Sequence, residues 1–136
     1  MLGPLLDRLR DRRRRRIWTS DQSTGRRGED LAHRFLRKRG LVIVARNYRL
    51  AAGDAEADLI ARDGDELVIV EVKTRETAEF GPPDRAVGPD KQRALRRVAR
   101  EYARRSGTPE AQVRFDVVAI TLTPSLEMEH FRGALS

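Results

Sequence analysis

Three charged residues beside hydrophobic segments form the part of this sequence that is best suited to chemistry. Glu71 and Lys73 end an almost unbroken apolar run that begins at Leu67, and Asp58 stands at the start of the preceding apolar run. Side chains alternate between the two faces of a strand, so Glu71 and Lys73 point the same way, and Asp58 on a paired strand can reach the same end of the sheet. We expect the three side chains to converge.

Two carboxylates and one ammonium group suit the hydrolysis of a phosphodiester with Mg²⁺ (or Mn²⁺). Magnesium prefers oxygen ligands and usually takes one or two protein carboxylates, with phosphate and water completing its shell. The metal stabilises charge on the phosphate and lowers the pKa of a bound water, which a lysine can hold or deprotonate. We interpret Asp58 and Glu71 as metal ligands and Lys73 as the catalytic cation. The alternative is a salt bridge between Glu71 and Lys73, because motifs this short are common.

A tight hairpin is expected to position these residues. The polar turn Asp63-Gly64-Asp65 separates the two apolar runs, and glycine supplies the positive φ that such a turn requires. The pattern predicts antiparallel strands over residues 55–62 and 66–73.

The other periodic segments predict an α/β fold. Apolar spacing predicts helices over 24–39 and 89–105 and strands over 41–48, 113–122 and 128–131. The order is therefore helix, three strands, helix, strand, strand. A helical crossover between the third and fourth strands implies a mixed central sheet flanked by helices.

Several segments also resemble a known group of nucleases. Asp58 with Glu71-Val72-Lys73 resembles the PD-(D/E)XK nuclease motif. The segments Gly28-Glu29, Arg46-Asn47-Tyr48, Glu56 to Ala61, Val70 to Arg75 and Phe115 to Val118 resemble the YraN family of bacterial proteins, which is similar to archaeal Holliday-junction resolvases. The resemblance implies a restriction-endonuclease-like core and an endonuclease that cuts structured or branched DNA.

The resemblance also implies a third acidic residue and shows two departures. Resolvase-like proteins bring an acidic residue of the first helix to the metal, which points to Glu29 as a catalytic residue and metal ligand. The alternative is a glutamate favoured by the dipole at a helix N-terminus. Ala57 stands where the superfamily name places proline, and Gly53-Asp54-Ala55 lengthens the turn before Glu56.

Basic residues gather on the second predicted helix. Arg93, Arg97, Arg100 and Arg104 recur at helical spacing and form a basic ridge, which Lys91 and Arg96 widen, whereas Leu95, Val98 and Tyr102 form the core stripe. The nucleic-acid-binding candidates are Arg46, Arg75, Lys91, Arg93, Arg97, Arg100 and Arg104. Phosphate contact is one interpretation of the ridge, and a solvated helix face is the other.

Composition bounds the organisation of the chain. With 136 residues and a net charge of +7, we expect a basic, flexible N-terminal extension over 1–22 and one nuclease-like domain over 23–136. The extension either contacts phosphates or is a disordered start. The lack of cysteine excludes disulfides and thiolate metal sites. No apolar run approaches the roughly 20 residues of a membrane span, so we expect a cytoplasmic protein without a membrane partner.

Three functions compete at this point. The leading one is a Mg²⁺-dependent endonuclease with DNA as its partner. The alternatives are a non-catalytic nucleic-acid-binding module with a nuclease-like fold and an assembly protein that meets an acidic partner. Two carboxylates beside a phosphate path would weaken binding unless a metal offsets them, which favours the enzyme. Whether two protomers combine to cut two strands, as a homodimer, stays open.

Overall fold

The computed structural model describes residues 19–79 and 81–135, so most of the predicted N-terminal extension lies outside the described residues. Its elements are α2 (Thr19–Lys38), β1 (Val42–Arg49), β2 (Glu56–Asp63), β3 (Glu66–Thr77), α3 (Pro89–Ser106), the 3-10 helix η1 (Glu110–Gln112), β4 (Val113–Thr123) and β5 (Glu127–Phe131). The predicted order of helices and strands is confirmed. The predictions did not include η1, and α2 begins before the predicted residue 24.

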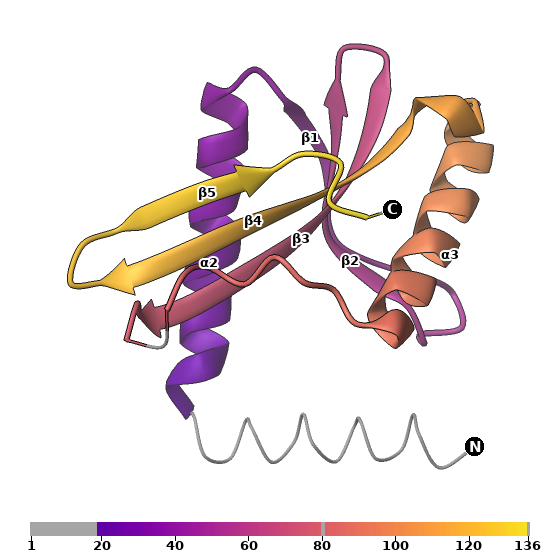
Figure 1. The fold of residues 1–136 in the computed structure, drawn as a ribbon. Coiled ribbons are helices and arrows are strands. Elements are labelled where there is room, and N and C mark those ends of the chain that lie inside the picture. The colour runs from indigo at the N-terminus through magenta and orange to yellow at the C-terminus, as the bar shows by residue number, and fades with distance from the viewer. Residues whose placement is uncertain (1–18, 80, 136) are drawn as a thin grey trace.

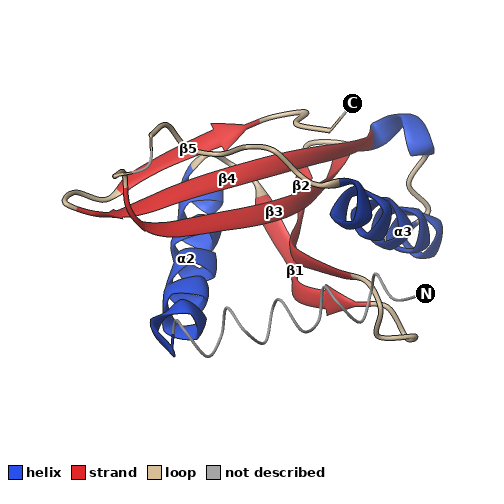
Figure 2. Cartoon of the chain, turned by 60° about the horizontal axis from the view of Figure 1, so that its bottom comes forward, coloured by secondary structure: helices blue, strands red, loops and turns tan. Residues whose placement is uncertain are grey.

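The strands form one mixed sheet of five strands in the order β1-β2-β3-β4-β5. Only β3 and β4 pair in parallel, while the three other neighbouring pairs are antiparallel. The chain returns from the end of β3 to the start of β4 through α3, as a parallel pair requires. Helix α2 (indigo in Figure 1) packs on one face of the sheet and α3 (orange) on the other, and Figure 2 shows the two helices from below. The predicted mixed sheet flanked by helices is confirmed.

The unbroken apolar run of β3 reflects burial on both faces. Val68 and Val70 pack in the core under α2, whereas Leu67 and Ile69 pack in the core under α3. A central strand between two helix layers needs apolar residues at every position, in contrast to the alternation of a half-exposed strand. The sheet face under α3 is therefore apolar until Glu71.

The predicted antiparallel hairpin is confirmed. Leu59 pairs with Val70 and Asp63 with Glu66, and Gly64 adopts the positive φ of 59° that the turn requires. Strand β3 continues past the predicted end at residue 73 to Thr77, because its parallel pairing with β4 extends that far.

Candidate active site

The site begins where β2 and β3 separate. The last backbone pair between the two strands is that of Leu59 and Val70. Past this pair, Val72 N donates a hydrogen bond to the side-chain oxygen Asp58 Oδ2 at 2.8 Å. The carboxylate thus takes the place of a backbone acceptor. This bond holds the Asp58 side chain beside the end of the apolar run of β3.

Asp58 and Glu71 lie together as the sequence predicts. Only 14% of the Glu71 side chain is exposed, and its carboxyl group shares a hydrogen bond with that of Asp58. Burial and the neighbouring Asp58 charge raise the pKa of Glu71 to about 8, and burial also raises the pKa of Asp58. Two carboxyl groups this close cannot both ionise easily, so near neutral pH Glu71 holds a proton that it donates to Asp58.

Lys91, which the sequence pattern predicts to widen the basic ridge, lies beside this carboxyl pair. Lys91 Nζ lies 3.3 Å from Glu71 Oε2 and donates to the backbone oxygen of Glu56 at 3.4 Å. Burial opposes the charge of Lys91, but the attraction of Glu71 and Asp58 outweighs it and raises the lysine pKa. Lys91 therefore faces the two carboxyl groups, and the prediction that it widens the outer ridge is wrong.

The sequence held a signal for this position. Lys91 lies four residues before Leu95, and with Val98 and Tyr102 these residues fall on one stripe of the helix. Leu95 and Val98 are buried against the sheet. A lysine that continues the core stripe must point toward the sheet, whatever its charge suggests.

Lys73 does not join the carboxyl pair. Its Nζ lies 3.2 Å from Asp84 Oδ2 and also donates to the backbone oxygen of Ala86. Asp84 is itself held, because Ala86 N donates to its Oδ1 at 2.8 Å. The loop between β3 and α3 folds back beside β3 and offers Lys73 closer acceptors than Asp58 or Glu71. The predicted convergence of all three side chains is therefore wrong for Lys73.

Glu29 approaches from the opposite helix. A Cβ on Gly28 would lie 1.8 Å from Thr74 Oγ1, so only glycine lets α2 pass this close to β3. Burial and the charge of Asp58 raise the pKa of Glu29, while Asn47 and Arg46 lower it. The Asp58 charge thus acts on the Glu29 carboxyl group. The partners that Glu29 contacts are nevertheless Asn47, through a hydrogen bond, and Arg46, at 3.9 Å.

Asn47 is a site residue that the predictions omit. It lies between the pairs Arg46–Leu59 and Tyr48–Ala57, opposite Asp58, and its φ of 49° is left-handed. Asparagine tolerates this conformation better than most side chains. Its place in the segment Arg46-Asn47-Tyr48 was a sequence signal, but only the fold shows that its side chain meets Glu29.

The donor set at this point fits a hard divalent cation. Glu71 Oε2 is buried and accepts no well-formed hydrogen bond, although Lys91 is its ion-pair partner. Two carboxylates are the number that Mg²⁺ usually takes from a protein. Over residues 19–79 and 81–135, no group of three or more His, Cys, Asp or Glu side chains is arranged to hold a metal ion. Asp58 and Glu71 would form the metal site, with Glu29 outside the pair.

The structure divides the predicted nucleic-acid-binding arginines by their partners. Arg93 pairs with Asp90, and Arg97 Nη1 lies 2.6 Å from Asp54 Oδ2. Arg100 and Arg104 have no ion-pair or hydrogen-bond partner in the described part of the chain.

The two predicted arginines outside α3 are both engaged. Arg46 lies 2.7 Å from Asp30. Arg75 donates to Thr121 Oγ1 at 2.9 Å and to the Pro82 oxygen at 3.2 Å. Nucleic-acid binding by any of these arginines stays a prediction.

Comparison with known proteins places the chain in a bacterial family. The sequence pattern described as "Uncharacterised protein family UPF0102" matches residues 28–120, a range that includes Glu29, Asp58, Glu71 and Lys73. The chain belongs to the UPF0102 family. This confirms the resemblance to the YraN family, which is the same group.

Relatives of this UPF0102 chain match over most of its length. A UPF0102 protein of Solibacter usitatus is 50% identical over 134 residues, which cover 98% of this chain and 99% of the relative. A UPF0102 protein of Rhodococcus jostii is 50% identical over 112 residues, or 81% of this chain and 93% of the relative. One of Geobacter sulfurreducens is 46% identical over 112 residues, covering 81% and 86%. None of these names states an activity. Among the described residues, no helix is long and apolar enough to cross a membrane.

Proposed function

We propose that this UPF0102 protein is a Mg²⁺-dependent (or Mn²⁺-dependent) endonuclease of the PD-(D/E)XK type that cleaves phosphodiester bonds in structured or branched DNA. One observation carries the proposal. The buried carboxyl pair of Asp58 and Glu71 has one oxygen without a well-formed hydrogen bond, although Lys91 Nζ lies 3.3 Å from it. A buried acidic pair of this kind is costly for stability and is typical of catalytic and metal-binding sites.

The proposed chemistry divides between the metal and the side chains. A bound Mg²⁺ supplies charge stabilisation at the phosphate and a more acidic water. Asp58 and Glu71 would hold the ion, and Glu71 must first give up the proton that burial and Asp58 now retain. Lys91, beside the pair, would then offset negative charge on the phosphate. Lys73 would position the attacking water once it leaves Asp84.

The direct test is cleavage by the purified full-length protein. A panel of four-way junctions, flaps, linear duplexes and single strands would be incubated with Mg²⁺, Mn²⁺ or EDTA. We expect metal-dependent cutting that favours a branched substrate and increases between pH 6 and 8, because Glu71 must be deprotonated to bind metal. No cutting of any substrate with either metal would overturn the proposal.

Variants of the three charged residues separate catalysis from binding. Asp58→Asn and Glu71→Gln should abolish cutting and leave DNA binding intact or tighter, because Asp58→Asn removes negative charge that faces the phosphate and Gln resembles the protonated form of Glu71. Lys73→Ala should also abolish cutting but should weaken binding, because it removes a cation. Asp65→Asn, in the exposed turn of the hairpin, is the matched carboxylate control and should change neither property.

A nucleic-acid-binding module without cleavage is the second candidate. The ion pairs of Lys91 with Glu71 and of Lys73 with Asp84 favour it, because both cations of the site already have partners. This candidate predicts that Asp58→Asn and Glu71→Gln tighten DNA binding whether or not metal is present, and that wild-type protein leaves every substrate of the panel intact.

A further inference from the structure

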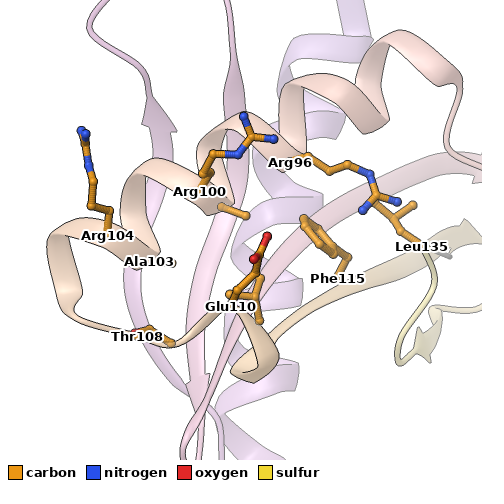
Figure 3. A pocket seen from close by; sticks show the side chains of 10 residues that line it. Arg96, Arg100, Ala103, Arg104, Thr108, Glu110, Phe115 and Leu135 are labelled. Atoms are coloured by element: carbon orange, nitrogen blue, oxygen red, sulfur yellow. The ribbon is translucent and has the colours of Figure 1, made fainter.

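A cavity of about 600 Å³ lies beside α3, away from the carboxyl pair (Figure 3). Arg96, Arg100 and Arg104 extend from the helix on one side, and Phe115 of β4 and Leu135 near the C-terminus lie on the other. A volume of this size falls within the range of about 300 to 1,000 Å³ that is typical of small-molecule sites. We call it the α3 cavity.

Two arginines of the α3 cavity lack partners among the described residues. Arg100 and Arg104 have no ionic or hydrogen-bond partner there, in contrast to Arg93 and Arg97 on the same helix. Glu110 of η1 is the acidic side chain in the lining of the cavity. Two arginines without partners favour an anionic ligand.

Much of the remaining lining is apolar and includes an aromatic ring. Ala99 and Ala103 come from α3 itself, and Val113, Phe115 and Leu135 come from elsewhere in the chain. The Arg96 guanidinium lies 5.5 Å from the centre of the Phe115 ring. Aromatic rings and guanidinium planes are the surfaces on which unstacked bases pack, and free arginines bind phosphates. A nucleotide combines a flat ring with an adjacent anion, which matches these two parts of the lining.

We propose that the α3 cavity binds one unstacked nucleotide of a single-stranded nucleic acid, with the base beside Phe115 and Arg96 and the phosphate at Arg100 and Arg104. That this nucleotide belongs to the strand that the protein cuts rests on the proposed endonuclease function. A helix rise of about 1.5 Å per residue places Arg100 about 14 Å along the α3 axis from Lys91.

Glu110 gives the α3 cavity a means to select the base. Its carboxylate projects into the cavity from the wall opposite Arg100 (Figure 3). A carboxylate accepts from the amino group of cytosine, which thymine lacks. The cavity should therefore prefer cytosine over thymine at the bound position.

Binding of labelled 12-mers by the full-length protein in EDTA tests the cavity without cleavage. We expect R100Q/R104Q to bind oligo-dC at least ten times more weakly at low salt, with a salt slope smaller by about 1.4, from about 0.7 per phosphate contact on a single strand. The control R34Q/R37Q removes the same charge from exposed positions of α2 that are not among the binding candidates, and should change affinity less than threefold. The arginine-rich N-terminus is identical in all variants.

Glu110→Ala and an RNA substrate complete the design. Glu110→Ala removes the acceptor and should remove a preference for oligo-dC over oligo-dT, and oligo-rC beside oligo-dC shows whether the strand is RNA or DNA. Equal losses in R100Q/R104Q and R34Q/R37Q, or no loss in either, would overturn the α3 cavity proposal. A protein that binds as expected but cuts nothing with Mg²⁺ or Mn²⁺ supports the cavity and refutes only the endonuclease.

Discussion

Two buried acidic regions of this molecule differ in how their charge is satisfied. Asp116 of β4 is fully buried, and both of its oxygens accept hydrogen bonds, from Arg114, from Gly133 N and from His130 at 2.7 Å. Glu71 is nearly as buried, yet it shares its space with a second carboxyl group and leaves one oxygen poorly bonded. Burial alone therefore does not distinguish a structural acid from one available for chemistry.

The pKa directions of the two regions express the same difference. Burial opposes the Asp116 charge, but the bonds from His130 and Arg114 outweigh it and lower the Asp116 pKa. For Glu71, burial and Asp58 act together and raise the pKa. Arg114 Nε lies 2.9 Å from Asp116 Oδ1. Partners thus decide which buried carboxylate stabilises the fold and which one is free to exchange a proton or bind a cation.

The largest expected effect distinguishes the two regions by stability. Asp116→Asn should lower the free energy of unfolding by roughly 3 kcal/mol, because it removes the buried carboxylate that Arg114, His130 and Gly133 N share, although Asp63 and Glu66 still pair with Arg114. Glu71→Gln should change it by less than about 1 kcal/mol, because Gln resembles the protonated form that the site already holds. Urea unfolding at pH 7 measures both. A Glu71→Gln loss as large as that of Asp116→Asn would make the two regions equivalent.

The pH dependence of unfolding should have opposite signs in the two regions. The Glu71 pKa is raised from 4.5 to about 8, so its contribution is fully present below pH 4.5 and is lost as pH rises toward 8. The slope is at most about 1.4 kcal/mol per pH unit. The Asp116 contribution is present above the unfolded pKa of 3.8 and is lost as pH falls through its lower folded value. Urea unfolding from pH 5 to 8 should show a slope that Glu71→Gln flattens. An unchanged slope in that variant would contradict the assignment.

Metal binding should have an effect of intermediate size on stability, and it should depend on the Asp58–Glu71 region. At ten times its dissociation constant, a ligand stabilises the folded state by about 1.4 kcal/mol. Mg²⁺ or Mn²⁺ should therefore raise the melting temperature more at pH 8 than at pH 6, because Glu71 must lose its proton. Asp58→Asn should remove this shift, and the exposed Glu127→Gln, as control, should keep it. A shift that persists in Asp58→Asn would place the metal elsewhere.

The smallest effect concerns an exposed ion pair. Asp84→Asn should leave the melting temperature nearly unchanged, because exposed pairs contribute little. It should nevertheless release Lys73 and increase the cleavage rate, since the loop no longer holds the ammonium group away from the carboxyl pair. A slower rate in this variant would show that the contact positions Lys73 for catalysis.

Local sequence patterns determined most of the fold and, in the site, the pairing of Asp58 with Glu71. The glycine turn and the continuous apolar run of β3 predict the hairpin, and the register that follows brings Asp58 to Glu71. Periodicity also predicts α3 and its core stripe, because period and burial are properties of neighbouring residues. These inferences need only the geometry of a strand or a helix.

Contacts between distant residues were decided by the tertiary structure. Lys73 pairs with Asp84, Lys91 turns from the ridge to Glu71, and Arg97 finds Asp54. A charged side chain has many acceptors within reach in an unfolded chain, and sequence spacing does not rank them. Packing ranks them, since it fixes which element lies beside which and how close two backbones come, as Gly28 does for α2 and β3.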